Sequence, residues 1–307
     1  MMKLNETILV TGAAGGRQGS TGYHVTRLLR ERGHAVRALV HTLDERSDRL
    51  RALGAEVVKG DLLDPVSVAE AMDGVRRSYF TFPVQDGLMG ATATFASAAR
   101  EAGSELVVNL SQLIRRTGEH RTPHQRRHWL SEQVFDWAGV GAVHLDATVF
   151  YENLRALTRT SVASAGEIRL PWGPETTTVA MIGAVDVARV AAGLLTGPAQ
   201  PNGTVLPLIG TVVTVGEIAE AYRDALGRPV RYREITDEQW VSAVSAGGMN
   251  PTAAEHLSHL WRRLRETPTE ERAEFRVSES IERITGAPPT SLREFLAEQR
   301  DVFTPAS

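Results

Sequence analysis

Glycines dominate the segment that follows the first apolar run, Ile8-Leu9-Val10. Five of the eleven residues from 12 to 22 are glycine, and an amphipathic stretch comes directly after them. Glycine permits a tight turn and lets backbone N–H groups approach a phosphate, and a helix N-terminus attracts negative charge. The segment therefore predicts a pyrophosphate-binding turn for a dinucleotide, the alternative being a glycine-rich turn that binds nothing. The turn residues that we assign to the cofactor are Gly12, Ala14, Gly15, Gly16, Arg17, Gln18 and Gly19.

The residues after the second apolar strand indicate which dinucleotide would bind. Sites for NAD usually carry an acid at the end of that strand, where it binds the ribose hydroxyls. Here His41 and Thr42 follow the strand, and the first acid is Asp44. Residues 17–51 hold eight arginines against four acids in a chain whose net charge is −3. Arg17, His41 and Arg46 are therefore candidate ligands of a 2′-phosphate, and we expect NADP(H) to be favoured over NAD(H). Most of the eight arginines can equally be solvated on helix faces.

Apolar runs and amphipathic stretches alternate through the first half of the chain. Apolar strands separated by helices are typical of a parallel sheet that is covered on both faces. We therefore predict an α/β fold with a doubly wound parallel (Rossmann) sheet in residues 1–150. Residues 151–307 form a smaller, mostly helical lobe in this prediction and partly rejoin the main sheet. The expected strands are Ile8-Leu9-Val10, Ala35 to Val40, Glu56-Val57-Val58, Tyr79 to Phe82, Leu106 to Leu110 and Val143 to Val149.

The composition excludes several classes of function. Acids exceed bases by 37 − 34 = 3, so the chain lacks the basic excess that grips nucleic-acid backbones. Cysteine is absent, which removes disulfides, thiolate metal sites and thiol nucleophiles. No signal peptide and no stretch long enough to span a membrane is evident, so we expect a cytoplasmic protein.

Motifs along nearly the whole chain are similar to those of one family. The segments Thr11 to Gly15, Val36 to Val40 and Gly54 to Asp61 resemble the NmrA-like group of atypical short-chain dehydrogenase/reductases. Three later segments match as well, namely His128 to Glu132, Val149 to Leu154 and Asp186-Val187-Ala188, and so does the stretch from Glu274 to Phe295. The resemblance implies a nicotinamide cofactor. It further implies either reduction of quinone-type or dye-type acceptors or sensing of the cofactor's redox ratio.

Two departures from the family pattern stand out. The third glycine of the turn, Gly19, comes one residue late, so either Gln18 or Gly19 fills the third role. The Tyr-x-x-x-Lys pair of conventional short-chain dehydrogenases is replaced by His124 and His128. In NmrA-like reductases a histidine often stands at the lysine position.

Ligands of open parallel sheets bind beyond the carboxyl ends of the strands. Asp61 and Leu62 follow the third strand, where adenine would lie, although Asp61 can instead be a loop acid that starts the next helix. Three further segments would surround the nicotinamide. We assign an apolar wall and hydrogen-bond donors to the side chains of these segments, with core packing as the alternative for each aromatic residue. The assigned residues are Phe82, Pro83, Ser111, Phe150 and Tyr151.

His124 and His128 are four residues apart and share one helix face. An ordinary imidazole pKa near 6.5 suits proton transfer at neutral pH, so both are catalytic candidates together with Ser111 and Tyr151. One buried and one solvated histidine is the alternative. His120 continues the spacing, but Pro123 places it before the helix, and we predict no metal site.

Two hypotheses of different class follow. In the first, the protein is an NAD(P)H-dependent reductase that transfers hydride to a small conjugated acceptor of quinone, enone or carbonyl type. In the second, it is a non-catalytic sensor of the NADP(H) ratio that regulates a protein partner. An isomerase, epimerase or tailoring enzyme on the same fold is a third reading, because function resides in sites rather than folds. A homodimer is compatible with each of them. The arginines between residues 115 and 127 are solvated, attract an anionic substrate or dock a partner.

Overall fold

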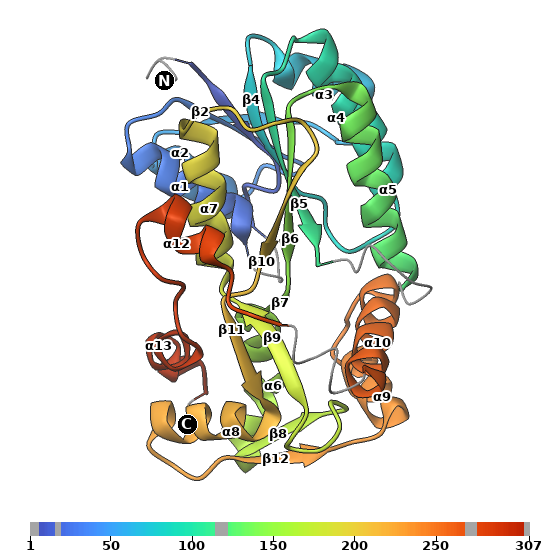
Figure 1. Cartoon of the computed structure of the whole chain (residues 1–307), viewed down its shortest axis with the longest axis vertical. Helices are drawn as coiled ribbons and strands as arrows, with labels where there is room; N and C mark the ends of the chain where they lie inside the picture. Colours follow the sequence, from blue (N-terminus) through green and yellow to red (C-terminus); the bar gives the residue numbers. More distant parts are fainter. Residues whose placement is uncertain (1–5, 16–19, 114–121, 268–274, 304–307) are drawn as a thin grey trace. The chain divides into compact units, whose positions relative to one another are not determined.

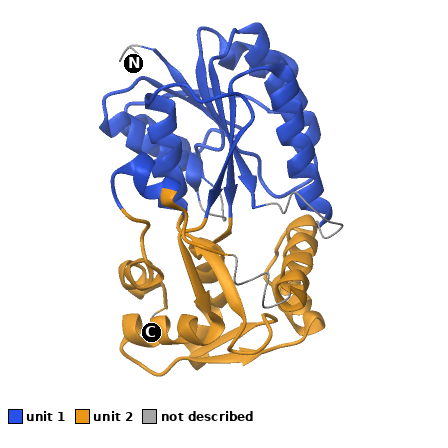
Figure 2. Cartoon of the chain, in the orientation of Figure 1, with its two compact units in different colours: residues 1–147, 184–208, 280–287 blue, residues 148–183, 209–279, 288–307 orange. Residues whose placement is uncertain are grey.

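The structure is a computed structural model that describes residues 6–15, 20–113, 122–267 and 275–303. The chain divides into two compact units, coloured separately in Figure 2. Unit 1 comprises residues 1–147, 184–208 and 280–287, and unit 2 comprises residues 148–183, 209–279 and 288–307. Each unit is therefore built from more than one stretch of the chain.

Unit 1 contains a parallel sheet of seven strands in the order β10-β6-β5-β4-β1-β2-β3. The chain order reverses between β1 and β4, where Val10 is in register with Ala38 on one side and Tyr79 on the other. The predicted doubly wound parallel sheet is confirmed. The strands are β1 (Ile8–Val10), β2 (Val36–Val40), β3 (Glu56–Lys59), β4 (Arg77–Phe80), β5 (Leu106–Gln112), β6 (Ala142–Ala147) and β10 (Thr204–Leu208).

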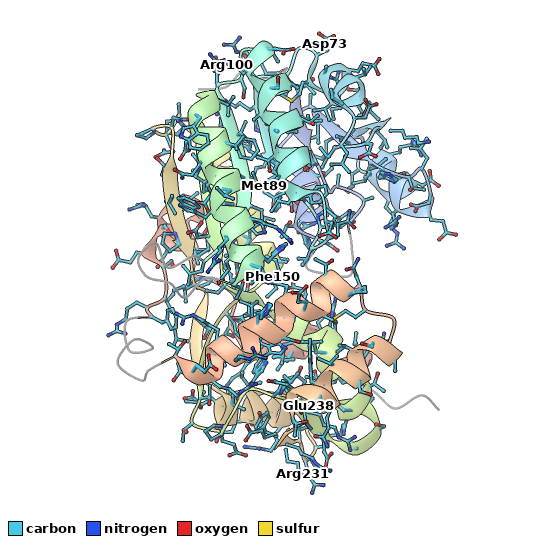
Figure 3. The ribbon with its side chains drawn as sticks, turned by 90° about the vertical axis from the view of Figure 1, so that its right-hand side faces the viewer. Asp73, Met89, Arg100, Phe150, Arg231 and Glu238 are labelled. Atoms are coloured by element: carbon cyan, nitrogen blue, oxygen red, sulfur yellow. The ribbon has the colours of Figure 1, made fainter. Side chains whose placement is uncertain are left out.

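Helices cover both faces of this sheet (Figure 1). One face carries α1 (Thr21–Glu31), α2 (Glu45–Ala52) and α7 (Ala184–Thr196). The other carries α3 (Pro65–Met72), α4 (Leu88–Glu101) and α5 (Pro123–Ala138), with α4 and α5 side by side in Figure 3. Capping residues stabilise the starts of two of these helices. Asp64 caps α3 before a first-turn proline, and Thr122 and Gln125 form a capping box on α5.

Aromatic side chains lock the second helical layer onto the sheet. The ring centroid of Phe80 on β4 lies 5.0 Å from that of Phe95 on α4 and 5.1 Å from that of Phe135 on α5. All three are fully buried, and burial of such a ring contributes roughly 1.5–3 kcal/mol. The packing fixes α5 against the strands whose ends carry the candidate site residues.

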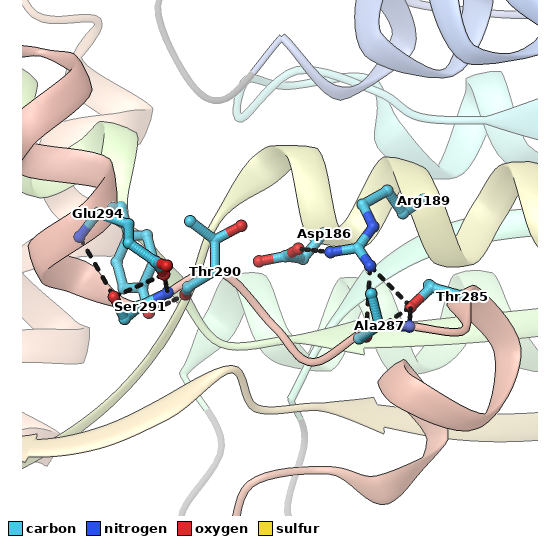
Figure 4. A network of polar contacts seen from close by, with 8 residues as sticks. Asp186, Arg189, Thr285, Ala287, Thr290, Ser291 and Glu294 are labelled. Atoms are coloured by element: carbon cyan, nitrogen blue, oxygen red, sulfur yellow. Dashed lines mark hydrogen bonds and ion pairs between the residues drawn. The ribbon is translucent and has the colours of Figure 1, made fainter.

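Two later segments of the chain complete unit 1. Strand β10 pairs in parallel with β6 at the sheet edge, and α12 (Glu279–Thr285) packs on α7. Figure 4 shows how Arg189 of α7 anchors this segment, by donating to Asp186, to Thr285 Oγ1 and to the Ala287 carbonyl at 2.8, 3.0 and 3.3 Å. The motif around Asp186 is thus occupied by contacts within the fold.

Unit 2 has its own core and contains strands as well as helices. The expected strand from Val143 to Val149 divides, because Val149 pairs with Met181 in a separate sheet. Two small sheets form, β11-β9-β7 and β12-β8. The elements are β7 (Val149–Phe150), α6 (Tyr151–Ala165), β8 (Glu167–Leu170), β9 (Thr178–Ile182), β11 (Thr211–Thr214), α8 (Val215–Leu226), β12 (Arg231–Glu234), α9 (Asp237–Ala246), α10 (Pro251–Glu266), α13 (Leu292–Glu298) and η1 (Arg300–Phe303).

Within the described ranges, no helix is both long enough and apolar enough to cross a membrane.

Candidate functional site

The ends of β1 and β4 are tied together where the strand order reverses. Thr11 Oγ1 donates to the Thr81 carbonyl at 3.0 Å, and the Thr81 amide donates back to Thr11 Oγ1 at 2.8 Å. These two hydrogen bonds join the residues that follow β1 and β4. In a doubly wound sheet this is the position at which ligands bind.

Glycines shape the turn that leaves β1. Gly12 and Gly15 have φ of 61° and 75°, a region that favours glycine, and the Gly15 amide donates to the Gly12 carbonyl at 3.1 Å. A Cβ on Gly22, in the first turn of α1, would lie 2.6 Å from the carbonyl oxygens of both Thr11 and Gly12. Gly22 thus provides the close packing of helix on strand that the third glycine of such a motif serves.

Gly22 is the turn residue that sequence reasoning did not assign, although its place among the five glycines was a usable signal. Ala14 is half-buried in the turn. The assigned residues Gly16, Arg17, Gln18 and Gly19 lie outside the described residues. Whether Gln18 or Gly19 also contributes stays a prediction.

Helix α1 begins directly after this turn, at Thr21. Ser20, the N-cap, has φ of 50° and makes no side-chain capping bond within the described part of the chain. The first turn carries no acidic residue. Backbone N–H groups at such a terminus attract an anion. A pyrophosphate-binding turn requires such left-handed glycines and such a helix start.

Charged side chains follow β2 and β3 and pair with one another. The His41 Nε2 atom lies 3.7 Å from Asp61 Oδ2. The guanidinium of Arg46 donates to the Asp44 carboxylate, with Nη2 to Oδ2 at 2.6 Å. The hydrogen bonds from Arg46 hold the pKa of Asp44 below its ordinary value. His41 and Arg46, the two described side chains that we assigned to a 2′-phosphate, therefore each lie beside an acid.

Apolar side chains line the neighbouring strand ends. Leu62 and Phe82 are partly buried against the core of unit 1. The ring of Phe82 lies beside Gly87, the N-cap of α4, where an added Cβ would be 3.4 Å from it. Pro83 follows, and its carbonyl accepts from the Gln85 amide at 2.8 Å. The structure thus brings Phe82 and Pro83 to the same edge of the sheet as Thr11.

Ser111 is committed to a buried carboxylate. Its hydroxyl donates to Glu132 Oε1 on α5 at 2.6 Å, and the two residues are 2% and 1% exposed. A hydroxyl has a single proton, so in this arrangement Ser111 offers a ligand its lone pairs rather than a hydrogen. Glu132 is a second residue that sequence reasoning quoted only as part of a motif. Its spacing of four from His128 places both on one face of α5.

His124 and His128 are brought together as predicted, but their proton chemistry differs from the expectation. Their ring centroids are 4.9 Å apart, at 74° between the planes. Burial lowers the pKa of His128 to about 3, and the neighbouring His124 adds to this effect. Burial, with Arg127 adding and Asp86 opposing, lowers the pKa of His124 to about 4. The expectation of ordinary values near 6.5 is wrong, because the apolar surroundings disfavour the charged form.

Both imidazoles are therefore neutral at pH 7. A neutral imidazole still donates one hydrogen bond from a ring nitrogen. The Nδ1 atom of His128 is buried and has no hydrogen-bond partner among the residues that the structure describes. Its bonding capacity is thus left over for a ligand.

Phe150 and Tyr151 belong to unit 2. Phe150, labelled in Figure 3, ends β7 and stands at the N-cap of α6. The ring of Tyr151 is fully buried 5.3 Å from that of Phe295, and its hydroxyl donates to the Thr290 carbonyl at 3.2 Å. That bond uses the proton that we assigned to a substrate oxygen, and the assignment stays a prediction.

Within the described ranges, no group of three or more His, Asp or Glu side chains is arranged to hold a metal ion.

Comparisons with known proteins show the family of the chain and its fold. The model of the NmrA-like family matches residues 4–296. An NAD(P)H azoreductase of Xenophilus azovorans is 29% identical over 302 residues, which cover 96% of this chain and 99% of that protein. A (4-alkanoyl-5-oxo-2,5-dihydrofuran-3-yl)methyl phosphate reductase of Streptomyces griseus is 27% identical over 300 residues, covering 97% and 99%.

Solved structures share the fold. The triphenylmethane reductase of Citrobacter sp. in complex with NADP(H) has a TM-score of 0.79 at 20% identity, with 96% of this chain and 99% of that one covered. NmrA, a negative transcriptional regulator in complex with NADP, has a TM-score of 0.79 at 18% identity, with 98% and 97% covered.

Proposed function

The chain belongs to the NmrA-like family, and from this premise we propose that it is an NAD(P)H-dependent reductase of a small conjugated acceptor. The observation that carries the proposal is the turn after β1, in which Gly12 and Gly15 have left-handed φ angles and Gly22 packs closely on two carbonyl oxygens, as a pyrophosphate-binding turn requires. Two relatives that align with nearly the whole chain are named as reductases, one of an azo compound and one of an unsaturated lactone. Both kinds of acceptor contain a polarised, conjugated double bond.

Unit 1 supplies the residues that would hold the cofactor. Backbone N–H groups of the glycine turn and the N-terminus of α1, whose first turn carries no acidic residue, suit the pyrophosphate. Asp61 and Leu62 follow β3 on the adenosine side, and Phe82 and Pro83 follow β4 on the nicotinamide side. When bound, the reduced nicotinamide supplies a hydride.

We assign NADPH as the preferred cofactor. His41 and Arg46 are the described candidates beyond β2, and Arg17 is the third candidate. Guanidinium groups bind phosphate oxygens through parallel hydrogen bonds. The triphenylmethane reductase that shares the fold was solved with NADP(H), which supports this choice.

Hydrogen-bond donation rather than proton transfer is the role that suits the buried face of α5. Negative charge develops on the acceptor as hydride arrives, and a fixed donor in a desolvated site stabilises it. His128, neutral and buried with an unused ring nitrogen, is our first candidate for this donor. His124 supports its orientation through the edge-to-face contact of the rings. The proton that completes the reduction then comes from water.

The proposal is tested by following the absorbance of reduced nicotinamide during mixing of the purified protein with NADPH or NADH. The acceptor panel includes quinones, azo dyes and unsaturated lactones, and calorimetry on the same samples measures cofactor binding. We expect turnover with NADPH. We also expect His128→Ala to lower kcat at least tenfold while changing the cofactor Kd by less than threefold. Unchanged kcat in this variant would remove His128 from the mechanism.

A second function is kept because the Tyr-x-x-x-Lys pair is missing and a regulator shares the fold. In that case the chain senses the NADP(H) ratio and regulates a protein partner without catalysis. Tight NADPH binding with no oxidation of any acceptor in the panel would favour it. Partner affinity would then differ between the oxidised and the reduced cofactor.

A further inference from the structure

The loop between β2 and α2 holds an arginine and an acid in a two-pronged pair. Arg46 Nε lies 3.0 Å from Asp44 Oδ2 and 3.2 Å from Oδ1, and Nη2 lies 2.6 Å from Oδ2. The same carboxylate caps α2, because Oδ1 also accepts from the Arg46 backbone amide at 3.0 Å. Asp44 therefore fixes both the start of the helix and the direction of the Arg46 side chain.

Other arginines in the basic stretch are paired in the same way. Arg51 Nη1 lies 2.7 Å from Asp48 Oδ1 on α2, and Arg37 Nε lies 2.9 Å from Glu56 Oε2 across β2 and β3. Part of the surplus of arginines counted from the sequence is thus paired with acids. Arg46 and Asp44 together carry no net charge, although they occupy the place where a 2′-phosphate would be recognised.

We propose that Asp44 restrains Arg46 and thereby limits the preference of the protein for NADPH over NADH. This inference rests on the proposed function, because it assumes that the adenosine ribose binds beyond β2. To bind a 2′-phosphate, Arg46 must break its hydrogen bonds to the Asp44 carboxylate or divide its donors between the two anions. The 2′-phosphate of NADPH therefore adds less binding free energy than it would beside an unpaired arginine. A 2′-hydroxyl, in contrast, donates a hydrogen bond that the Asp44 carboxylate accepts. One acid therefore opposes NADPH and supports NADH.

The restraint persists at neutral pH. The hydrogen bonds from Arg46 hold the pKa of Asp44 below its ordinary value, so the carboxylate stays charged in any assay near pH 7. Both side chains are partly exposed, 49% for Arg46 and 35% for Asp44, and a ligand can therefore reach them.

The test compares Asp44→Asn with the wild-type protein. Asparagine caps helices as well as aspartate does, so α2 keeps its start while Arg46 loses its anionic partner. Calorimetric titrations with 2′,5′-ADP and 5′-ADP isolate the 2′-phosphate and need no turnover. We expect the affinity ratio for 2′,5′-ADP over 5′-ADP to rise roughly tenfold in Asp44→Asn, which is the scale of one charge-assisted hydrogen bond. The affinity ratio for NADPH over NADH should rise by the same factor.

A matched control and a double variant identify the cause. Asp48→Asn removes an equal charge from the same helix and frees Arg51, and it should change the ratio less than twofold. In an Arg46→Ala background, Asp44→Asn should raise the ratio clearly less than it does in the wild-type background, because no guanidinium remains to be released and only the carboxylate's own effect on the 2′ group is lost. Circular dichroism melts check that each variant is folded.

The outcomes separate this inference from the proposed function. A ratio that stays the same in Asp44→Asn, or rises as much in Asp48→Asn or without Arg46, would overturn the inference while cofactor binding stands. Failure of the wild-type protein to bind any of the four nucleotides would overturn the proposed function and this inference with it.

Discussion

The turn after β1 and the buried face of α5 are two halves of one candidate site built on different principles. The turn consists of backbone groups, and its geometry depends on the absence of a Cβ atom at Gly12, Gly15 and Gly22. The α5 face consists of side chains whose chemistry depends on their surroundings, as the pKa of His128 near 3 shows. An added side-chain atom should therefore disrupt the backbone turn, whereas a change in burial or in neighbouring charges should alter the chemistry of the α5 side chains.

The sharpest way to break the backbone half is Gly22→Ala. The new Cβ would meet two carbonyl oxygens at 2.6 Å, and neither carbonyl is at the end of a flexible side chain. Displacing the turn should cost roughly 1–3 kcal/mol of stability and weaken NADPH binding more than tenfold. Urea denaturation and calorimetry measure the two effects.

Gly247→Ala is the matched control for this change. A Cβ at Gly247 meets only ordinary contacts at 3.4 and 3.5 Å, and its φ of −75° is open to alanine. Stability and cofactor affinity should stay close to wild type. If Gly22→Ala bound NADPH as well as this control does, the turn would not be the pyrophosphate site.

Glu132 tests the side-chain half. Its carboxylate accepts the Ser111 hydroxyl at 2.6 Å in a buried setting. Glu132→Ala leaves that hydroxyl without its acceptor and opens a cavity, and should cost about 3 kcal/mol in urea denaturation. Glu132→Gln keeps an acceptor and should cost about 1 kcal/mol. Equal costs for the two substitutions would show that the bond is unimportant.

The histidine pair on α5 should make the stability of the protein depend on pH. The pKa values of His124 and His128 are lowered to about 4 and 3 in the folded chain, so the unfolded chain binds more protons below its ordinary value of 6.5. Stability from this source is fully present above pH 6.5 and is lost as pH falls toward 3. Urea denaturation between pH 7 and 4 should therefore show a smaller loss for His128→Gln than for wild type. A parallel loss in both proteins would contradict the burial of this imidazole.

Tyr151→Phe is expected to have the smallest effect. The hydroxyl makes its bond to the Thr290 carbonyl inside unit 2, and its removal should cost about 1 kcal/mol. The cofactor Kd should change less than twofold in calorimetry. A large fall in kcat without a change in Kd would instead support Tyr151 as the donor to the substrate.

Alternating apolar strands and amphipathic helices predicted the parallel sheet, because both patterns are local and each strand is buried on two faces. Helix starts at Asp64 and Thr122 were also visible, since caps depend on neighbours in sequence. The division of the run from Val143 to Val149 between two sheets was not, because Val149 finds its partner Met181 more than thirty residues later.

The chemistry of side chains was harder to predict than their identity. Residue types and spacing brought His124 and His128 to one face, but only the packing around α5 determines their pKa values. The charge count likewise pointed to Arg46 and could not show that Asp44 holds it. Gly22 stood among the five glycines of the turn, but its particular role is defined by the carbonyl oxygens that it approaches.

Transfer of deuterium from NADPH labelled at C4 of the nicotinamide tests the central claim most directly. An unsaturated lactone is the acceptor, because a hydride added to its carbon–carbon double bond stays on carbon. If the protein is a reductase, deuterium appears at the β-carbon of the saturated product, and turnover is slower with the labelled cofactor than with the unlabelled one. Tight NADPH binding with no labelled product from any conjugated acceptor would contradict the reductase proposal and leave the sensor as the better description.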